Sequence, residues 1–164
     1  MAVVLKNKAN IDYGETLKKI TQVALTKLDL EDINIELVIS NSIKNEFVNY
    51  VSSFYICKGL NKIDDGYSLR LDSSNTFILY AQVICHELLH IKQIEDKKLI
   101  VHDSGFYWNL KQYPSGMHQL DRPWEQEIIN SDKNLAVKVL NGVWPGKAKI
   151  HKKNFISMES DYKN

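Results

Sequence analysis

The five residues His86-Glu87-Leu88-Leu89-His90 have the types and spacing of a metal-dependent hydrolytic centre. On a helix each residue advances about 100°, so positions four apart lie within about 40° of each other, one turn up. His86 and His90 can therefore bind one metal ion, and a catalytic zinc takes three protein ligands and one water molecule. Glu87 lies beside the pair, where it can take a proton from the metal-bound water and pass it to a leaving amine. The motif predicts a zinc-dependent metallopeptidase with His86 and His90 as ligands and Glu87 as catalytic base.

The helix around the motif, predicted over 76–96, has an apolar side and a histidine side. Ala81, Ile84, Leu88 and Ile91 fall on the half opposite His86. Core histidines would lie within the apolar stripe, so the pattern predicts two histidines on the exposed side of a helix with a buried back. Gln93 follows on the histidine side and is a candidate to hold a ligand histidine in one tautomer, with an exposed surface position as the alternative.

The third ligand has four downstream candidates, which are His102, His118, Glu125 and Glu127. On the helix predicted from Pro123 onward, Glu125 shares a face with apolar residues, whereas Glu127 lies about 200° round. A buried carboxylate needs a positive partner or a metal, so this pattern favours Glu125 as the ligand and predicts a solvated Glu127. An ion pair with Arg122 is the alternative for Glu125.

Three separate motifs resemble, in order, those of a family of small phage and bacterial zinc metallopeptidases. They are HELLHIKQ at 86–93, an aromatic stretch with Trp108 and Tyr113, and DRPWEQE at 121–127; the family pattern is HExxHxxQ, a tryptophan-containing loop and RPWExEA. Ile128 departs from it, because the family usually has alanine there. The resemblance implies a gluzincin-like site with His86, His90 and Glu125 as zinc ligands and Glu87 as base. SprT-like proteases are a weaker resemblance, in which His102 of the stretch 102–106 would be the third ligand.

The remaining patterns, taken with the resemblance, predict an α+β fold in a single compact zincin-like domain. The expected elements are an N-terminal helix, a small, mainly antiparallel sheet of about three strands, the HExxH helix, an irregular loop and a third-ligand helix; they cover 16–28, 33–39, 47–57, 67–71, 76–96, 97–119 and 123–140. Residues 73–75 are expected to cap the long helix. The domain is predicted over 1–146 and a polar tail over 147–164.

Composition limits the partners and the location. The formal net charge of +1 gives no electrostatic reason to expect nucleic acid or an anionic membrane as the main partner. No segment approaches a membrane span, and the N-terminus lacks the features of a signal peptide, so a cytoplasmic protein is expected, or a virion-associated one if a phage encodes it. Cys57 and Cys85 are too few for a disulfide framework, and Cys85 is expected to be a buried, inert thiol.

Zinc-dependent hydrolysis of a peptide or protein substrate is the predicted function. Two alternatives remain open, a non-enzymatic zinc-fold module of a phage particle and a DNA-associated protease of the SprT-like kind. Strand 67–71 is the candidate sheet edge for binding an extended substrate. Tyr107, Tyr113 and His118 are candidate donors to the reaction's oxyanion, and Trp124 is expected in the core.

Overall fold

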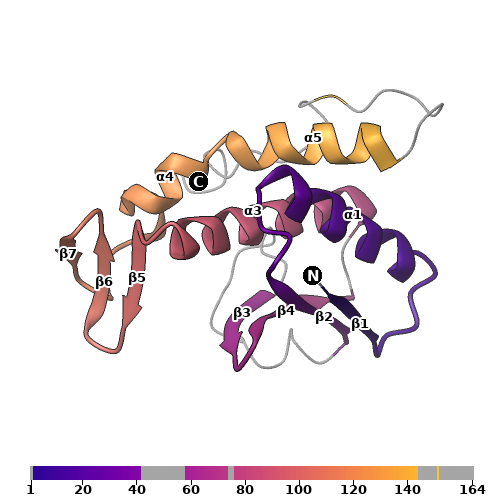
Figure 1. Ribbon diagram of the computed structural model, residues 1–164, viewed down its shortest axis with the longest axis horizontal. Coiled ribbons are helices and arrows are strands. Elements are labelled where there is room, and N and C mark those ends of the chain that lie inside the picture. The colour runs from indigo at the N-terminus through magenta and orange to yellow at the C-terminus, as the bar shows by residue number, and fades with distance from the viewer. Residues whose placement is uncertain (1, 42–57, 74–75, 144–150, 152–164) are drawn as a thin grey trace.

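The computed structural model describes residues 2–41, 58–73, 76–143 and 151. It contains helices and two small sheets, which confirms the α+β class (Figure 1). Among the described helices, none combines the length and the apolarity that crossing a lipid bilayer requires. The strand predicted over 47–57 lies outside the described residues.

The main sheet is mixed rather than mainly antiparallel. Its strand order is β1 (Val3–Asn7), β2 (Asn34–Ser40), β4 (Gly66–Asp72) and β3 (Lys58–Ile63). β1 pairs with β2, and β2 with β4, in parallel, and only β3 runs antiparallel to β4. The prediction of a mainly antiparallel sheet was wrong because it missed β1. The helix between β1 and β2 is a crossover connection, which lets the two strands run in parallel.

Strand β4 is internal, so the prediction that 67–71 forms a sheet edge was also wrong. A two-residue turn at Asp64 and Asp65 joins β3 and β4 in a hairpin. β4 therefore has β3 on one side and β2 on the other. Among the described strands, β3 therefore forms this edge of the sheet.

The helices cover one face of the sheet in two layers. α1 (Gly14–Lys27) and α3 (Phe77–Glu95) lie next to the sheet, and α5 (Ser131–Val143) packs over both of them (Figure 1). Side chains from all of these elements form one buried core, including Leu17, Leu37, Leu69, Ile84 and Val139. This core anchors the apolar side of α3 and so fixes where its histidines lie.

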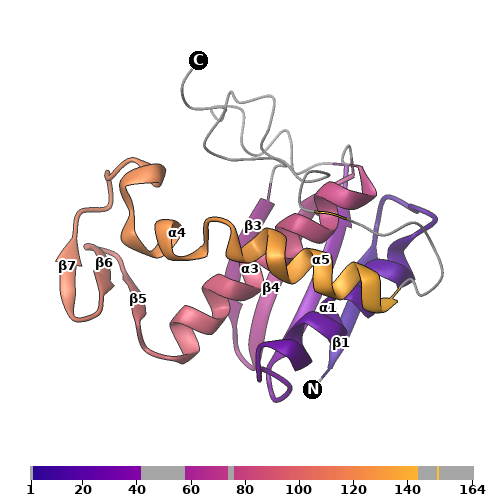
Figure 2. The same ribbon diagram turned by 90° about the horizontal axis from the view of Figure 1, so that it is seen from above.

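Residues 97–119, predicted to be irregular, contain a second sheet with three strands in antiparallel order. These are β5 (Leu99–His102), β6 (Gly105–Trp108) and β7 (Lys111–Tyr113). The sheet lies beyond the C-terminal end of α3, away from the main sheet (Figure 2). Leu99, Trp108 and Trp124 form a small apolar cluster of their own beneath it.

The predicted helix over 123–140 is two helices, separated by a turn. A short 3-10 turn, η1 (Gln119–Asp121), precedes α4 (Pro123–Ile128), and α5 begins at Ser131. Asn130 has φ 73°, a left-handed conformation that asparagine adopts more readily than most residues, and this ends the first helix. At the start of α3, Thr76 is the N-cap and makes no side-chain cap hydrogen bond. Of the residues predicted to cap this helix, 74 and 75 lie outside the described residues.

Gly66 is expected to be essential for the close pairing of β2 and β4. A Cβ atom there would lie 2.0 Å from the backbone oxygen of Asn34, and backbone cannot yield as a flexible side chain can. Gly66→Ala should lower the free energy of unfolding by about 1–3 kcal/mol, the usual cost of overpacking. Urea denaturation measures this, with Gly142→Ala as the control, because a Cβ at Gly142 meets nothing within 4 Å. Equal unfolding midpoints for the two variants would contradict the close pairing.

Candidate metal centre

Helix α3 presents both histidines of the motif on one side, one turn apart. Their rings lie 4.8 Å apart between centroids and are nearly perpendicular. His86 and His90 are buried, at 2% and 8% exposure, so the prediction of a solvent-exposed histidine side was wrong. The reason is that α4 and α5 both pack against α3 and cover that side.

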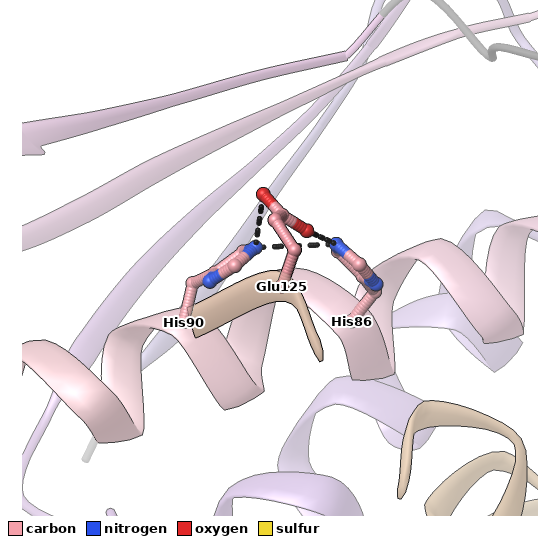
Figure 3. A group of neighbouring side chains, drawn as sticks. All are labelled: His86, His90 and Glu125. Carbon is pink, nitrogen blue, oxygen red and sulfur yellow. Dashed lines mark hydrogen bonds and ion pairs between the residues drawn. The ribbon is translucent and has the colours of Figure 1, made fainter. Parts of the chain in front are cut away.

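Glu125 comes from α4 and meets the two histidines. Its Oε2 atom lies 3.3 Å from Nε2 of His86, and its Oε1 atom lies 3.3 Å from Nε2 of His90 (Figure 3). The side chain is 6% exposed. Burial raises the pKa of this carboxyl group, but the two imidazoles lower it more, so the pKa lies well below its usual range. The sequence prediction thus identified all three members of this group, which could hold a metal ion.

The three residues offer ligand atoms that all lie within 4.8 Å of one another, close enough to surround one metal ion. The two Nε2 atoms are 3.2 Å apart, and each lies 3.3 Å from a different oxygen of Glu125. Zinc bonds of about 2.0–2.1 Å in tetrahedral geometry place neighbouring ligand atoms about 3.3–3.4 Å apart. In addition, Oε2 of Glu125 is buried and has no hydrogen-bond partner among the described residues. A buried, unsatisfied carboxylate oxygen is costly, and a cation at the centre of the group would satisfy it.

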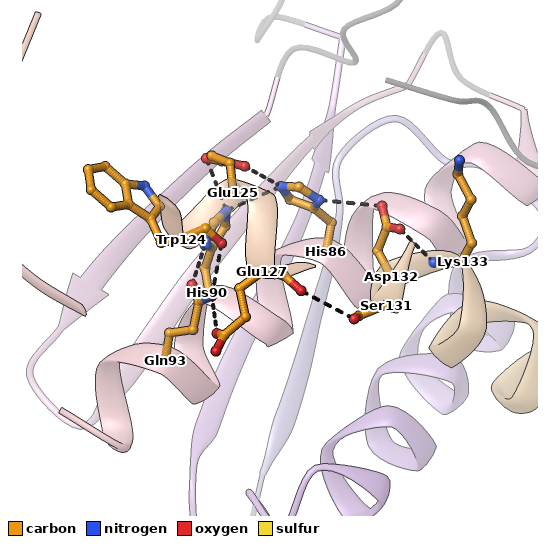
Figure 4. Close-up of polar contacts among 9 residues, drawn as sticks. All are labelled: His86, His90, Gln93, Trp124, Glu125, Glu127, Ser131, Asp132 and Lys133. Atoms are coloured by element: carbon orange, nitrogen blue, oxygen red, sulfur yellow. Dashed lines mark hydrogen bonds and ion pairs between the residues drawn. The ribbon is translucent and has the colours of Figure 1, made fainter. Parts of the chain in front are cut away.

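Gln93 determines which nitrogen of His90 faces the group. The Gln93 amide nitrogen donates to the backbone oxygen of Trp124 at 2.9 Å and to Oε2 of Glu127 at 2.8 Å (Figure 4). With both of its N–H groups used, the amide presents Oε1 to Nδ1 of His90, 3.0 Å away. Because that oxygen only accepts, Nδ1 carries the hydrogen and Nε2 keeps its lone pair for a metal. Gln93 is 3% exposed, which excludes the alternative that it is an exposed surface residue.

Asp132, at the start of α5, holds His86 in the same way. Its Oδ2 atom lies 3.4 Å from Nδ1 of His86, and the side chain is 3% exposed (Figure 4). A carboxylate at this position favours a hydrogen on Nδ1, which leaves Nε2 of His86 as the metal-facing atom. Our sequence analysis missed Asp132, although it stands three and four residues before the apolar Leu135 and Ala136, a spacing that places it on the inward face of α5.

Replacing Gln93 is expected to weaken metal binding. Gln93→Ala removes the acceptor for His90, and losing such an outer partner typically lowers metal affinity about 10–100-fold. Lys98→Gln is the control, since it breaks only the exposed ion pair between Lys98 and Glu127. Competition with a chromophoric chelator measures both. Affinities of the two variants within threefold of each other would argue against a positioning role for Gln93.

Glu87 opens onto a cleft beside the metal-binding group. The cleft has a volume of about 780 Å³, and its walls include Glu87, His90 and Glu125 together with residues from β3, β4, β5 and β6. Glu87 is 5% exposed. A molecule in the cleft would therefore meet a potential base and two of the three potential metal ligands together.

The other candidate ligands are not part of the group. His102 is exposed at the end of β5, and its ring packs against Tyr107, with 5.6 Å between centroids. His118 is exposed, and Glu127 is exposed and paired with Lys98 at 2.9 Å. Glu127 is thus at the surface as predicted, although it also supports Gln93.

Several further predictions concern residues around the cleft. Arg122 donates from Nε to the backbone oxygen of Met117, and the ion pairs of Glu125 within the described chain are with the histidines, not with Arg122. Trp124 is 2% exposed and lies in the small apolar cluster, as expected of a core residue. The proposed oxyanion donors Tyr107, Tyr113 and His118 do not line the cleft.

Cys85 is fully buried, as expected for an inert thiol. Burial, followed by the charge of Asp132, raises the pKa of the Cys85 thiol.

Comparison with protein-family models finds no match to the chain, and comparisons with curated proteins and with solved structures find none either. The function proposed below for the site therefore rests on the geometry of its residues.

Proposed function

We propose that the protein is a zinc-dependent, gluzincin-like metallopeptidase with His86, His90 and Glu125 as zinc ligands. The observation that carries the proposal is the convergence of two Nε2 atoms and a buried carboxylate within 4.8 Å of one another, next to a cleft that Glu87 lines. A His₂Glu set suits zinc, which prefers imidazole and carboxylate ligands in catalytic sites. His102 is not part of this group, so the proposal does not follow the SprT-like alternative, in which His102 would be the third ligand.

The chain's own residues supply the proton transfers. When bound, zinc supplies Lewis-acid chemistry, lowering the pKa of a water molecule and polarising the substrate carbonyl. Glu87 follows His86 directly in α3, so its carboxylate takes the proton that this water loses and delivers it to the nitrogen of the leaving amine. Gln93 and Asp132 keep both imidazoles in the tautomer that binds metal, and burial excludes bulk water from the ligands.

The substrate is proposed to be a peptide in extended conformation. Among the described strands, β3 is the outer strand on its side of the sheet, and Lys62 near its end lines the cleft. A peptide aligned with β3 would use the backbone groups of that strand that no described strand pairs with, which is a common mode of peptide recognition. This proposal moves the substrate edge from the strand predicted in the sequence analysis to its neighbour.

Metal removal tests the proposal. Dialysis against a chelator should abolish hydrolysis of an unfolded protein substrate, and stoichiometric zinc should restore it. Zinc at about a thousand times its Kd should also add about 4 kcal/mol to the free energy of unfolding, because it binds only the folded state. A His86→Ala/His90→Ala double variant should show neither effect. If zinc changes neither hydrolysis nor thermal unfolding of the wild type, the proposed function is wrong.

A further inference from the structure

The wall of the cleft opposite the main sheet is apolar and partly exposed. Ile100 and Val101 on β5 are 38% and 58% exposed, and both line the cleft. The same wall contains further apolar side chains, from Ile94, Leu99, Phe106 and Trp124. An apolar side chain of a bound peptide would remove this surface from water, and such burial is favourable.

Three cations surround the same cleft, and they come from three separate segments. Lys62 lies on β3, Lys97 lies between α3 and β5, and Arg122 directly precedes α4. The carboxylates among the lining residues are Glu87, the proposed base, and Glu125, a proposed metal ligand.

The two lysines of the cleft, unlike Lys92 and Lys98, have no ion pair with another described residue. Lys98 is paired with Glu127, and Lys92 with Asp96. Within the described part of the chain, no carboxylate lies within ion-pair distance of Lys62 or Lys97. The guanidinium of Arg122 lies over the ring of Phe106, 5.4 Å from its centroid, and so faces the apolar wall. The cleft thus presents two lysines that no carboxylate of the described residues neutralises, next to exposed apolar surface.

We propose that the cleft selects peptides in which a carboxylate accompanies an apolar side chain. The apolar side chain packs against β5, Phe106 and Trp124, and the carboxylate lies among Lys62, Lys97 and Arg122. The carboxylate can belong to an acidic side chain or to the C-terminus of the substrate, since both present the same charge. This inference rests on the proposed function, because it assigns a substrate class to the same cleft.

Four labelled decapeptides of one apolar sequence test the selectivity. Three have blocked ends and carry two glutamates, two glutamines or two lysines, and the fourth is the glutamine peptide with a free C-terminal carboxylate. We would measure kcat/KM with the zinc-loaded wild type. We would measure Kd by fluorescence anisotropy with zinc-loaded Glu87→Gln, which is expected to bind the peptides without cleaving them. The charge variant is Lys62→Gln/Lys97→Gln. Its matched control is Lys8→Gln/Lys19→Gln, which removes the same charge from exposed positions outside the cleft.

The expected result is a preference of about tenfold for a peptide with a carboxylate over the blocked glutamine peptide. Each exposed ion pair contributes a factor of about two to five, and the carboxylate can pair with both lysines. The preference should fall to within twofold in Lys62→Gln/Lys97→Gln, persist in the control and weaken with added salt. Whichever acidic peptide is preferred identifies the source of the carboxylate. Selective binding by Glu87→Gln without any wild-type hydrolysis would leave this inference standing and remove the proposed function. Equal Kd values for all four peptides, or a preference unchanged in Lys62→Gln/Lys97→Gln, would overturn it.

Discussion

Glu87→Gln is expected to lower kcat for peptide hydrolysis by about 10²–10⁴-fold, the usual contribution of a general base. Glutamine has nearly the same shape as glutamate but cannot take a proton from water. Since Glu87 is outside the group of three ligand residues, the variant should bind zinc with the affinity of the wild type. Initial rates on an unfolded protein substrate, with zinc content measured on the same samples, check both parts.

The control for this variant is Glu31→Gln, the same chemical change at an exposed position before β2. It should keep the wild-type rate. If Glu87→Gln retained more than a tenth of the wild-type kcat with its zinc in place, another group would have to be the base, and the assignment of Glu87 would be wrong.

Glu125→Gln is expected to have the largest effect on metal binding. The change replaces a buried anion, whose pKa the histidines hold low, by a neutral amide that binds zinc poorly. Loss of a residue that only hydrogen-bonds a metal ligand typically lowers metal affinity about 10–100-fold. Loss of Glu125, a proposed ligand itself, should therefore lower zinc affinity more than about 100-fold. Isothermal titration with zinc measures the change.

Glu127→Gln provides the comparison, because it lies two residues away on the exposed side of α4. Its amide oxygen can still accept the hydrogen bond from Gln93, so zinc affinity should stay within about tenfold of the wild type, inside the range for outer partners. Similar losses in the two variants would mean that Glu125 has no special place in the centre.

The three residues of the group that could hold a metal ion were predictable because their evidence is largely local in the chain. The spacing of His86 and His90 on a helix, and the apolar neighbours that turn Glu125 inward, are properties of single segments. The break at Asn130 removes part of the basis of that inference, because Ala136, Val139 and Leu140, which were used to orient Glu125, lie beyond it in α5. Glu125 is nevertheless buried, as was inferred. Asp132 was predictable by the same reasoning and was missed.

The sheets were less predictable because strand pairing joins distant residues. Nothing local to Val3–Asn7 indicates that it pairs in parallel with Asn34–Ser40, and this pairing made our mainly antiparallel sheet wrong. The strands β5 to β7 are three or four residues long, too short for a periodic pattern, and the Trp108–Trp124 contact that supports them joins residues separated by β7 and η1. The burial of both histidines followed from the packing of α4 and α5 against α3, not from the pattern of α3.

An anomalous-difference map, collected at the zinc edge from a crystal grown with zinc, tests the central claim most directly. The account predicts one strong peak about 2.0–2.2 Å from Nε2 of His86, Nε2 of His90 and a carboxylate oxygen of Glu125. A map without a peak at this point, or with the peak bound to His102 in place of Glu125, would contradict it.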